Sequence, residues 1–217
     1  MIDPRSAYLV VEGPIGVGKT SLVRRLAGRF GTATLLEQAE ENPFLERFYR
    51  DPQAAAFPTQ LHFLFQRSRQ LAGLKQGDLF RRGLVADFMF EKDRLFAALN
   101  LDHHEFALYE QVYGRLAIDA PPPDLVVYLQ APVEVLLARI HKRGRPQEAT
   151  ITADYLQRLC AAYTDFFYRY DAAPLLVVNA AMLNPVEREA DLALLAERIC
   201  DAGPGRTYFN PAPLDLA

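Results

Sequence analysis

The chain has 217 residues, half of them apolar, and a formal net charge of −3. This length can bury one sizeable hydrophobic core and is short for two α/β domains, so we expect a single domain over residues 1–217. The small negative charge argues against a nucleic-acid partner, because binding a phosphate backbone needs many cations. We expect no membrane partner either, since no segment is long and apolar enough to span a bilayer.

Five short β-rich runs alternate along the chain with long stretches of helical periodicity. In order they are AYLVVE, ATLLE, GLVADF, DLVVYLQ and PLLVVN. Such alternation predicts a three-layer α/β/α fold, with helices on both faces of a five-stranded parallel sheet. The tail over residues 203–217 is rich in Gly and Pro and is expected to be irregular. Cys160 and Cys200 lie in helical patterns without metal-type spacing, which favours reduced thiols and a cytoplasmic protein.

A glycine-rich segment, GPIGVGKTS at residues 13–21, follows the first β-rich run. It matches G-x-x-x-x-G-K-[ST], the phosphate-binding loop (P-loop), and its place between strand and helix favours a P-loop kinase fold. Glycines let successive N–H groups point at an anion, and the helix that begins near Gly18 adds its positive dipole end. Lys19 would reach the β- and γ-phosphates, and Thr20 would offer its hydroxyl to Mg²⁺. We expect ATP to be bound by Gly13, Gly16, Val17, Gly18, Lys19, Thr20 and Ser21.

Two acidic residues close the next β-rich runs, at the edge where open α/β sheets present groups to a ligand. Glu37 could accept the proton of an attacking hydroxyl, although a solvated glutamate at a strand end fits this position equally well. Asp87 could hold Mg²⁺ together with Thr20, or it could cap the following helix. We favour the magnesium role for Asp87.

The segment ARIHKRGRP after the fourth β-rich run is dense in arginine. Arg139 and Arg143 lie four residues apart on one helix face, and Arg145 follows just beyond a glycine. Arginines bind phosphate oxygens in a bidentate manner and could neutralise charge as a phosphoryl group moves. They are also common on exposed helix faces. On a chain with a P-loop we favour an Arg-rich lid over residues 139–150, with Arg143 in a catalytic role.

These segments together resemble the deoxyribonucleoside kinase family, in particular its bacterial purine-directed members. The likeness covers AYLVVEGPIGVGKTS, LLEQAEENPFLERFYRDP, FPTQLHFLFQRSRQL and RIHKRGRPQEATITADYLQRL. It implies that Glu37 is the base for the 5′-hydroxyl of a deoxynucleoside and that Gln60 pairs with the edge of the base. Tyr49 and Glu148 would contact the sugar 3′-hydroxyl, and Asp87 would lie beside the acceptor. Acceptance of purines such as deoxyadenosine and deoxyguanosine, for nucleotide salvage, also follows from the resemblance.

One position departs from the family pattern. The family places an arginine directly after the acid that ends the third strand, near the catalytic glutamate, whereas this chain has Phe88 there. Lys92 or Arg94, on the helix that follows, could supply the missing cation.

Two other functions remain open at this point. A nucleoside monophosphate kinase similar to thymidylate kinase would need a second cationic site for the acceptor phosphate, and Glu37 would face a dianion poorly. A non-catalytic nucleotide switch would leave Glu37, Tyr49 and Glu148 without a purpose.

The oligomeric state follows from two apolar helical segments, LHFLFQRSRQLAGL and EFALYEQVYGRLAI. They carry more hydrophobic surface than one sheet face needs. Together with the family resemblance, they predict a homodimer.

Overall fold

The computed structural model describes residues 2–75, 83–116 and 122–211. Its strands are β1 (Tyr8–Glu12), β2 (Ala33–Leu35), β3 (Leu84–Ala86), β4 (Leu125–Gln130), β5 (Leu175–Asn179) and β6 (Arg206–Phe209). Its α-helices are α1 (Lys19–Phe30), α2 (Leu45–Arg50), α3 (Pro52–Lys75), α4 (Lys92–Asn100), α5 (His103–Leu116), α6 (Val133–Arg143), α7 (Ala153–Arg169) and α8 (Glu189–Cys200). Short 3₁₀ helices η1 (Ala39–Glu41) and η3 (Pro146–Glu148) lie in loops.

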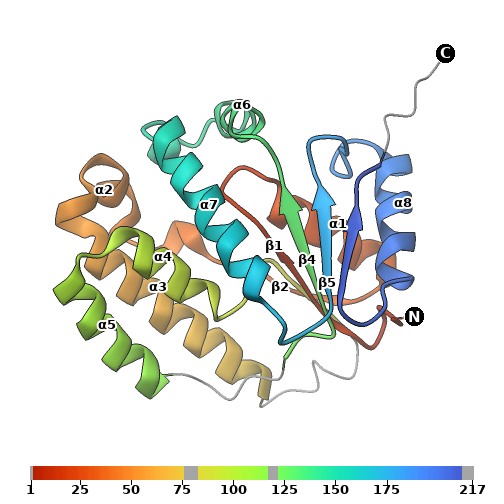
Figure 1. Ribbon diagram of the computed structural model, residues 1–217, viewed down its shortest axis with the longest axis horizontal. Coiled ribbons are helices and arrows are strands. Elements are labelled where there is room, and N and C mark those ends of the chain that lie inside the picture. The colour runs from red at the N-terminus through yellow and green to blue at the C-terminus, as the bar shows by residue number, and fades with distance from the viewer. Residues whose placement is uncertain (1, 76–82, 117–121, 212–217) are drawn as a thin grey trace.

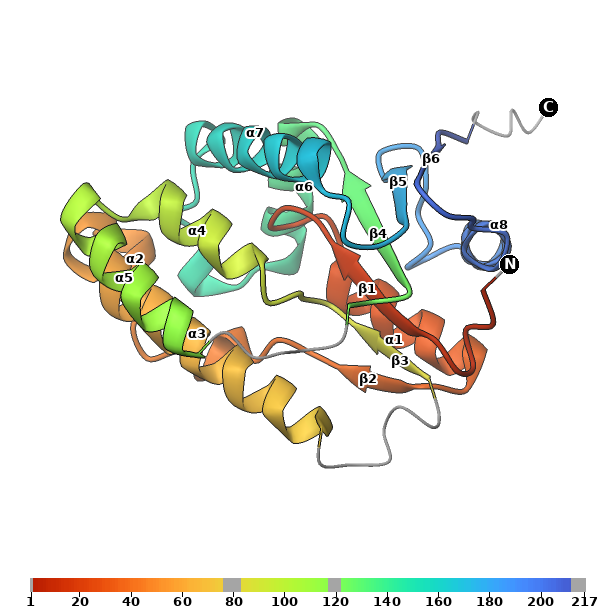
Figure 2. The same ribbon diagram turned by 60° about the horizontal axis from the view of Figure 1, so that its bottom comes forward.

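The described strands form a parallel sheet in the order β2-β3-β1-β4-β5-β6. Helices α1 and α8 cover one face, while α3, α4 and α7 lie on the other, where α5 packs against α3 and α4 (Figures 1 and 2). The predicted three-layer α/β/α fold is therefore confirmed. Within the described residues, none of the helices combines the length and the apolar character that crossing a bilayer requires.

The sixth strand corrects the prediction of five strands and of an irregular tail over residues 203–217. Strand β6 lies in that tail and pairs in parallel with β5. Its sequence, RTYF, contains three residues that favour strands, but Gly and Pro around the run masked this local preference. Phe209 joins the core, and the guanidinium of Arg206 donates to the Phe167 carbonyl oxygen at 2.7 Å. Residues 212–217 lie outside the described part of the chain.

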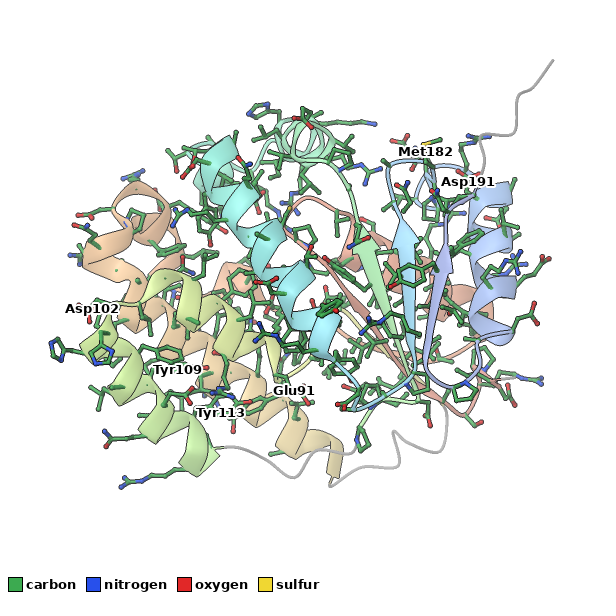
Figure 3. The ribbon with its side chains drawn as sticks, in the orientation of Figure 1. Glu91, Asp102, Tyr109, Tyr113, Met182 and Asp191 are labelled. Carbon is green, nitrogen blue, oxygen red and sulfur yellow. The ribbon has the colours of Figure 1, made fainter. Side chains whose placement is uncertain are left out.

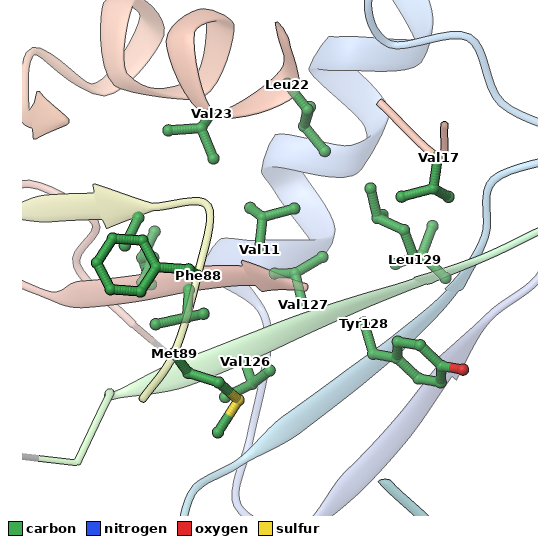
Figure 4. Close-up of a cluster of buried hydrophobic side chains, with 14 of the residues drawn as sticks. Val11, Val17, Leu22, Val23, Phe88, Met89, Val126, Val127, Tyr128 and Leu129 are labelled. Atoms are coloured by element: carbon green, nitrogen blue, oxygen red, sulfur yellow. The ribbon is translucent and has the colours of Figure 1, made fainter. Parts of the chain in front are cut away.

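The core is built on strands that are apolar on both faces, as expected for a parallel sheet between two helical layers. Every residue of β1 is buried, and so are the first five of β4. Val11 and Val127 from these strands share a core cluster with Leu22 and Val23 of α1 (Figure 4). Burial of each such side chain stabilises the fold by about 1.5–3 kcal/mol. This packing fixes α1, and with it the P-loop, against the centre of the sheet.

The P-loop needs glycine for steric reasons as well as for its dihedral angles. Gly16 has φ +86°, and a Cβ at this position would lie 2.8 Å from the Leu136 carbonyl oxygen. Gly18 has φ +102° and is the N-cap of α1, which begins at Lys19 as the motif predicts. The loop therefore turns sharply and presents the start of α1 to the carboxyl edge of the sheet.

Alanine is expected to have opposite effects at two glycines of this region. Gly16→Ala should lower the free energy of unfolding by about 1–3 kcal/mol, since it combines a positive φ with a backbone clash. Gly28→Ala, in α1 with no heavy atom within 4 Å of the added Cβ, should raise it by about 0.5–1 kcal/mol. Urea unfolding of both variants measures these changes. Equal stabilities would contradict the steric argument.

Candidate active site

Three loops that follow neighbouring strands meet at the carboxyl edge of the sheet. The P-loop follows β1, Glu37 follows β2 and Asp87 follows β3. Asp87 is 1% exposed and links the other two loops. Its Oδ2 accepts a hydrogen bond from Thr20 Oγ1 at 2.5 Å, and its Oδ1 accepts one from the Glu37 backbone N–H at 2.6 Å. The N-cap of α4 is Glu91, so Asp87 does not cap that helix and instead accepts hydrogen bonds from the P-loop and the β2 loop.

Lys19, the first residue of α1, lies across the P-loop. Its Nζ donates hydrogen bonds to the carbonyl oxygens of Gly13 at 2.7 Å and of Pro14 at 3.3 Å. Burial, followed by the like charge of Lys92, lowers the pKa of its ammonium to about 8, although nearby carboxylates oppose this. Lys19 therefore carries its charge at neutral pH and loses it under mildly alkaline conditions.

Glu37 is paired with two cations. Arg67 on α3 donates to Glu37 Oε1 from Nε at 2.9 Å and also from Nη2. Lys92, the first residue of α4, places its Nζ 3.3 Å from Glu37 Oε2. Burial by itself would raise the pKa of this carboxyl group, but Arg67 and Lys92 outweigh burial and hold the pKa at about 2. Glu37 is therefore ionised throughout the neutral range.

Two adjoining cavities flank the P-loop. One, the Glu37 cavity of about 560 Å³, lies beside β2 and α3 and is lined by both Glu37 and Lys19. The other, the Arg139 cavity of about 370 Å³, lies beside the ends of β4 and β5 and the loop that leads into α8. Residues of the P-loop line both cavities, so ligands in the two spaces would meet at this loop.

The residues predicted for the site divide between these two cavities. The Glu37 cavity is lined by Gly16, Gly18, Lys19, Thr20, Ser21, Glu37, Tyr49, Gln60, Asp87, Arg143, Arg145 and Glu148. The Arg139 cavity is lined by Gly16, Val17, Gly18, Ser21, Arg139 and Arg143. Gly13 is not among the described residues that line either cavity. Its carbonyl oxygen holds Lys19, and a Cβ there would lie 2.5 Å from the Leu129 carbonyl oxygen.

Three side chains predicted to contact the nucleoside that accepts the phosphoryl group present different chemical groups to the Glu37 cavity. Gln60 is 2% exposed, and its Oε1 has no hydrogen-bond partner among the described residues. Burial raises the pKa of Tyr49 well above its usual value, so its hydroxyl stays protonated. Glu148, in η3, is buried, pairs with Arg143 and lies 3.7 Å from Nη1 of Arg145. The cavity therefore offers an amide, a neutral hydroxyl and a carboxylate.

The three lid arginines do not form one cluster. Arg143 and Arg145 both turn to Glu148. Arg139 instead donates to the carbonyl oxygens of Val17 at 3.1 Å and of Ala180 at 2.8 Å, in the wall of the Arg139 cavity. The segment predicted as a lid thus contains one arginine fixed to backbone carbonyl oxygens and two that are directed to a carboxylate.

Three buried ionisable residues of the site belong to none of the motifs in the sequence: Glu12, Arg67 and Asp93. Glu12, at the end of β1, is 0% exposed, and its Oε1 lies 3.7 Å from Lys92 Nζ. Arg67 also pairs with the buried Asp93, so it bridges two carboxylates. Arg67 lies seven residues, two helical turns, after Gln60, and this spacing was a usable signal for a second cavity-facing residue on α3. The sequence signal for Glu12 was weaker, because it consists only of an acidic residue at the end of an apolar strand.

The position that departs from the family pattern faces the core. Phe88 is 0% exposed and belongs to the hydrophobic cluster around β1 and β4 (Figure 4). Of the two candidate replacements, Arg94 donates to Glu110 at 2.8 Å on the exposed side of α4. Only Lys92 of these two approaches Glu37.

A parallel sheet with a P-loop between two cavities defines a P-loop nucleotide-binding protein. A family model described as deoxynucleoside kinase matches residues 9–201. The chain belongs to the deoxynucleoside kinase family, whose members transfer a phosphoryl group to a hydroxyl acceptor.

Curated relatives and solved structures agree with this family. The chain is 36% identical over 161 residues to a deoxyguanosine kinase of Bacillus subtilis, covering 72% of this chain and 76% of the relative. It is 31% identical over 207 residues to a deoxyguanosine kinase of Lactobacillus acidophilus, with 89% of each covered. A deoxyadenosine kinase from M. mycoides with bound dATP has a TM-score of 0.77 at 26% identity, covering 89% of this chain and 98% of that chain. The same kinase with the products dCMP and dCDP has a TM-score of 0.78 at 27% identity, covering 88% and 98%.

Alkaline pH is expected to weaken the binding of a nucleoside triphosphate through Lys19. With its pKa at about 8 in the free protein, Lys19 is neutral at higher pH and no longer attracts the phosphates, so kcat/KM for ATP should fall above that value. Initial rates over a range of pH test this. Lys19→Arg should move the alkaline limb upward, since a guanidinium keeps its charge. If the alkaline limb of Lys19→Arg lies at the same pH as that of the wild type, the limb reports the titration of another group.

Proposed function

We propose that this kinase transfers the γ-phosphoryl group of ATP to the 5′-hydroxyl of a purine deoxynucleoside, deoxyadenosine or deoxyguanosine, in cytoplasmic nucleotide salvage. The observation that carries the proposal is that Glu37 and Lys19 line one cavity. A proton acceptor and a phosphate-binding cation thereby face the same space. The names of the relatives, deoxyguanosine and deoxyadenosine kinases, support the purine acceptor. Two free, half-buried cysteines are compatible with a reducing compartment.

The acceptor occupies the Glu37 cavity. The unpartnered Oε1 of Gln60, together with its NH₂ group, offers an acceptor and a donor to the edge of a base. Tyr49, held neutral, donates to the sugar 3′-hydroxyl, and Glu148 accepts from it. This arrangement directs the 5′-hydroxyl toward Glu37 and the P-loop.

The donor lies along the P-loop with its base in the Arg139 cavity. The guanidinium of Arg139, fixed by two carbonyl oxygens, presents a flat cationic surface on which a base can stack. The phosphates follow the P-loop N–H groups toward Lys19. Arg143, which lines both cavities, exchanges Glu148 for phosphate oxygens when the donor binds.

Magnesium fits the pair formed by Thr20 and Asp87. A hydroxyl and a buried carboxylate lie 2.5 Å apart beside the P-loop, and Mg²⁺ commonly takes one carboxylate and one hydroxyl together with phosphate oxygens and water. When bound there, Mg²⁺ neutralises charge on the β- and γ-phosphates.

In the transfer step, the 5′-oxygen forms a bond to the γ-phosphorus as the bond to the β-bridging oxygen breaks. The hydroxyl proton passes to Glu37, and ADP leaves with the electron pair of the broken bond. Lys19 and Arg143 stabilise the charge on the equatorial oxygens.

Glu37→Gln tests this assignment. It should lower kcat by about 10²–10⁴-fold, the usual contribution of a general base, and leave ATP affinity close to that of the wild type. Glu46→Gln, at an exposed carboxylate on α2, is the matched control and should keep full activity. Turnover is measured with the four natural deoxynucleosides and with their 5′-monophosphates, and ATP binding by calorimetry.

Two outcomes would contradict the proposal. Preferential use of monophosphates by the wild type would indicate a monophosphate kinase, and ATP binding without any turnover would indicate a nucleotide switch. Turnover close to that of the wild type in Glu37→Gln, or a loss of turnover that is accounted for by lost ATP binding, would overturn the role of Glu37 as the base.

We also propose that two copies associate through α3 and α5. Phe65 on α3 is 43% exposed and Leu108 on α5 is 48% exposed. The two helices lie side by side on the side of the molecule away from α8 (Figures 1 and 2). Large apolar side chains exposed on adjacent helices favour an interface, and a second copy would bury them about a two-fold axis.

Leu108→Glu is expected to convert the dimer to a monomer, since it would place two carboxylates in an apolar interface. Light scattering during size exclusion measures the mass. Met182→Glu is the control, because Met182 is 40% exposed and lies at the opposite end of the molecule (Figure 3). A wild-type monomer at working concentration would end the proposal.

A further inference from the structure

We propose that Lys92 is a positioning residue for the catalytic base, fixing the Glu37 carboxylate against the P-loop in place of the arginine that the family pattern carries at position 88. The inference rests on the proposed function, because Glu37 must be the base for its orientation to affect turnover.

Lys92 contacts the carboxylate oxygen of Glu37 that does not accept from Arg67. Arg67 donates to Oε1, whereas Lys92 Nζ lies 3.3 Å from Oε2. Two cations on separate oxygens set the rotation of the carboxylate plane, which neither cation sets alone. The Lys92 side chain is 2% exposed, so its ammonium lacks the water that would otherwise compete for it.

Glu12 holds Lys92 in place from the other side. Its Oε1 lies 3.7 Å from Lys92 Nζ and accepts from the Met89 N–H at 2.9 Å. Its Oε2 accepts from the Gly13 N–H and from the Tyr163 hydroxyl, both at 3.1 Å. Glu12 is thus immobilised by the P-loop, the β3 loop and α7.

The result is a continuous link between the base and the phosphate-binding lysine. Glu37 contacts Lys92, Lys92 contacts Glu12, and Glu12 accepts from the N–H of Gly13. The carbonyl oxygen of Gly13 in turn accepts from Lys19 Nζ at 2.7 Å. Lys92 is the member of this link that joins the β2 loop to the P-loop.

The neighbouring positions do not supply this cation. Phe88 is buried in the core, and Arg94 is directed to Glu110 on the outer side of α4. Lys92, four residues after Phe88, is one residue before Asp93, which pairs with Arg67. A cation in α4 therefore supplies the second positive charge beside Glu37, in addition to Arg67.

Other charged and titratable groups face Glu37 from each element packed against it, and they decide what loss of Lys92 would do. They are Glu12 of β1, Lys19 of α1, Tyr49 of α2, Arg67 of α3, Asp87 after β3, Asp93 of α4 and Tyr163 of α7. Only two of these are cations. Without Lys92, three other carboxylates remain near Glu37, so protonation of Glu37 becomes easier and its pKa rises.

Lys92→Met tests the proposal, because it keeps the length of the side chain and removes the charge. It should lower kcat on the order of 100-fold, the lower range of general-base effects, while KM for ATP changes little. The acid limb of kcat should move up by about one to three pH units. Lys92→Arg should restore most of the rate, and Arg94→Met, on the same helix, should behave as the wild type.

A double variant distinguishes two effects of Lys92 on turnover: orientation of the Glu37 carboxylate and neutralisation of the buried Glu12 charge. Glu12→Gln/Lys92→Met removes the charge that loss of Lys92 would leave unpaired, and the single amide oxygen of Gln can still accept a hydrogen bond from the Met89 N–H or from the Gly13 N–H. It should fold, as circular dichroism will show, and stay as slow as Lys92→Met. Recovery of kcat in the double variant, or a wild-type rate and pH profile in Lys92→Met, would overturn the proposal.

A readout independent of turnover separates this inference from the proposed function. Titration of ¹³C-labelled glutamate by NMR should show a higher pKa for Glu37 in Lys92→Met than in the wild type, and an unchanged pKa would refute the proposal. Wild-type protein inactive on every deoxynucleoside would instead refute the proposed function, while the titration still tests the contact between Lys92 and Glu37.

Discussion

A run of charges of alternating sign, buried or half-buried at the carboxyl edge of the sheet, sets the geometry of the site. In order the charges belong to Glu12, Lys92, Glu37, Arg67 and Asp93. Removing one member of a buried pair leaves its partner unpaired, at a cost of about 3–5 kcal/mol. The run joins β1, α4, the β2 loop and α3, so these charges act in addition to the hydrophobic packing that β1, α3 and α4 already share.

The two ends of this run meet different parts of the site. At one end Glu12 accepts from the N–H of Gly13, which belongs to the P-loop. At the other end Asp93 accepts from the Tyr109 hydroxyl at 2.7 Å, and Tyr109 lies on α5, next to α3 and α4 (Figure 3). The phosphate-binding loop and the helical layer around the Glu37 cavity thus form one electrostatic unit. A ligand that excludes water from this cavity strengthens each attraction along the run, because the local dielectric falls.

Local pattern was enough to predict most of the fold and part of the site. The P-loop and the start of α1 follow from glycine spacing, and the positions of Glu37 and Asp87 follow from the rule that strand ends face a ligand. Strand β6 escaped prediction because only three residues of strand preference stand among Gly and Pro. The contact of Lys92 with Glu37 joins residues 55 apart in the chain, and no helical or strand period relates them. The family resemblance made Lys92 one of two candidates, and the sheet order, which places the β2 loop beside α4, selects it over Arg94.

The low pKa of Glu37 clarifies what the charges around it achieve. A carboxylate with a pKa of about 2 is too weak a base to remove the proton of a free alcohol. In phosphoryl transfer the alcohol becomes acidic only as its oxygen bonds to phosphorus, so the acceptor of the proton needs to be in place more than it needs to be strong. Arg67 and Lys92 reduce the basicity of Glu37 and at the same time fix its direction. In the proposed mechanism the site therefore favours the orientation of Glu37 over its strength as a base, which suits a reaction governed by in-line geometry.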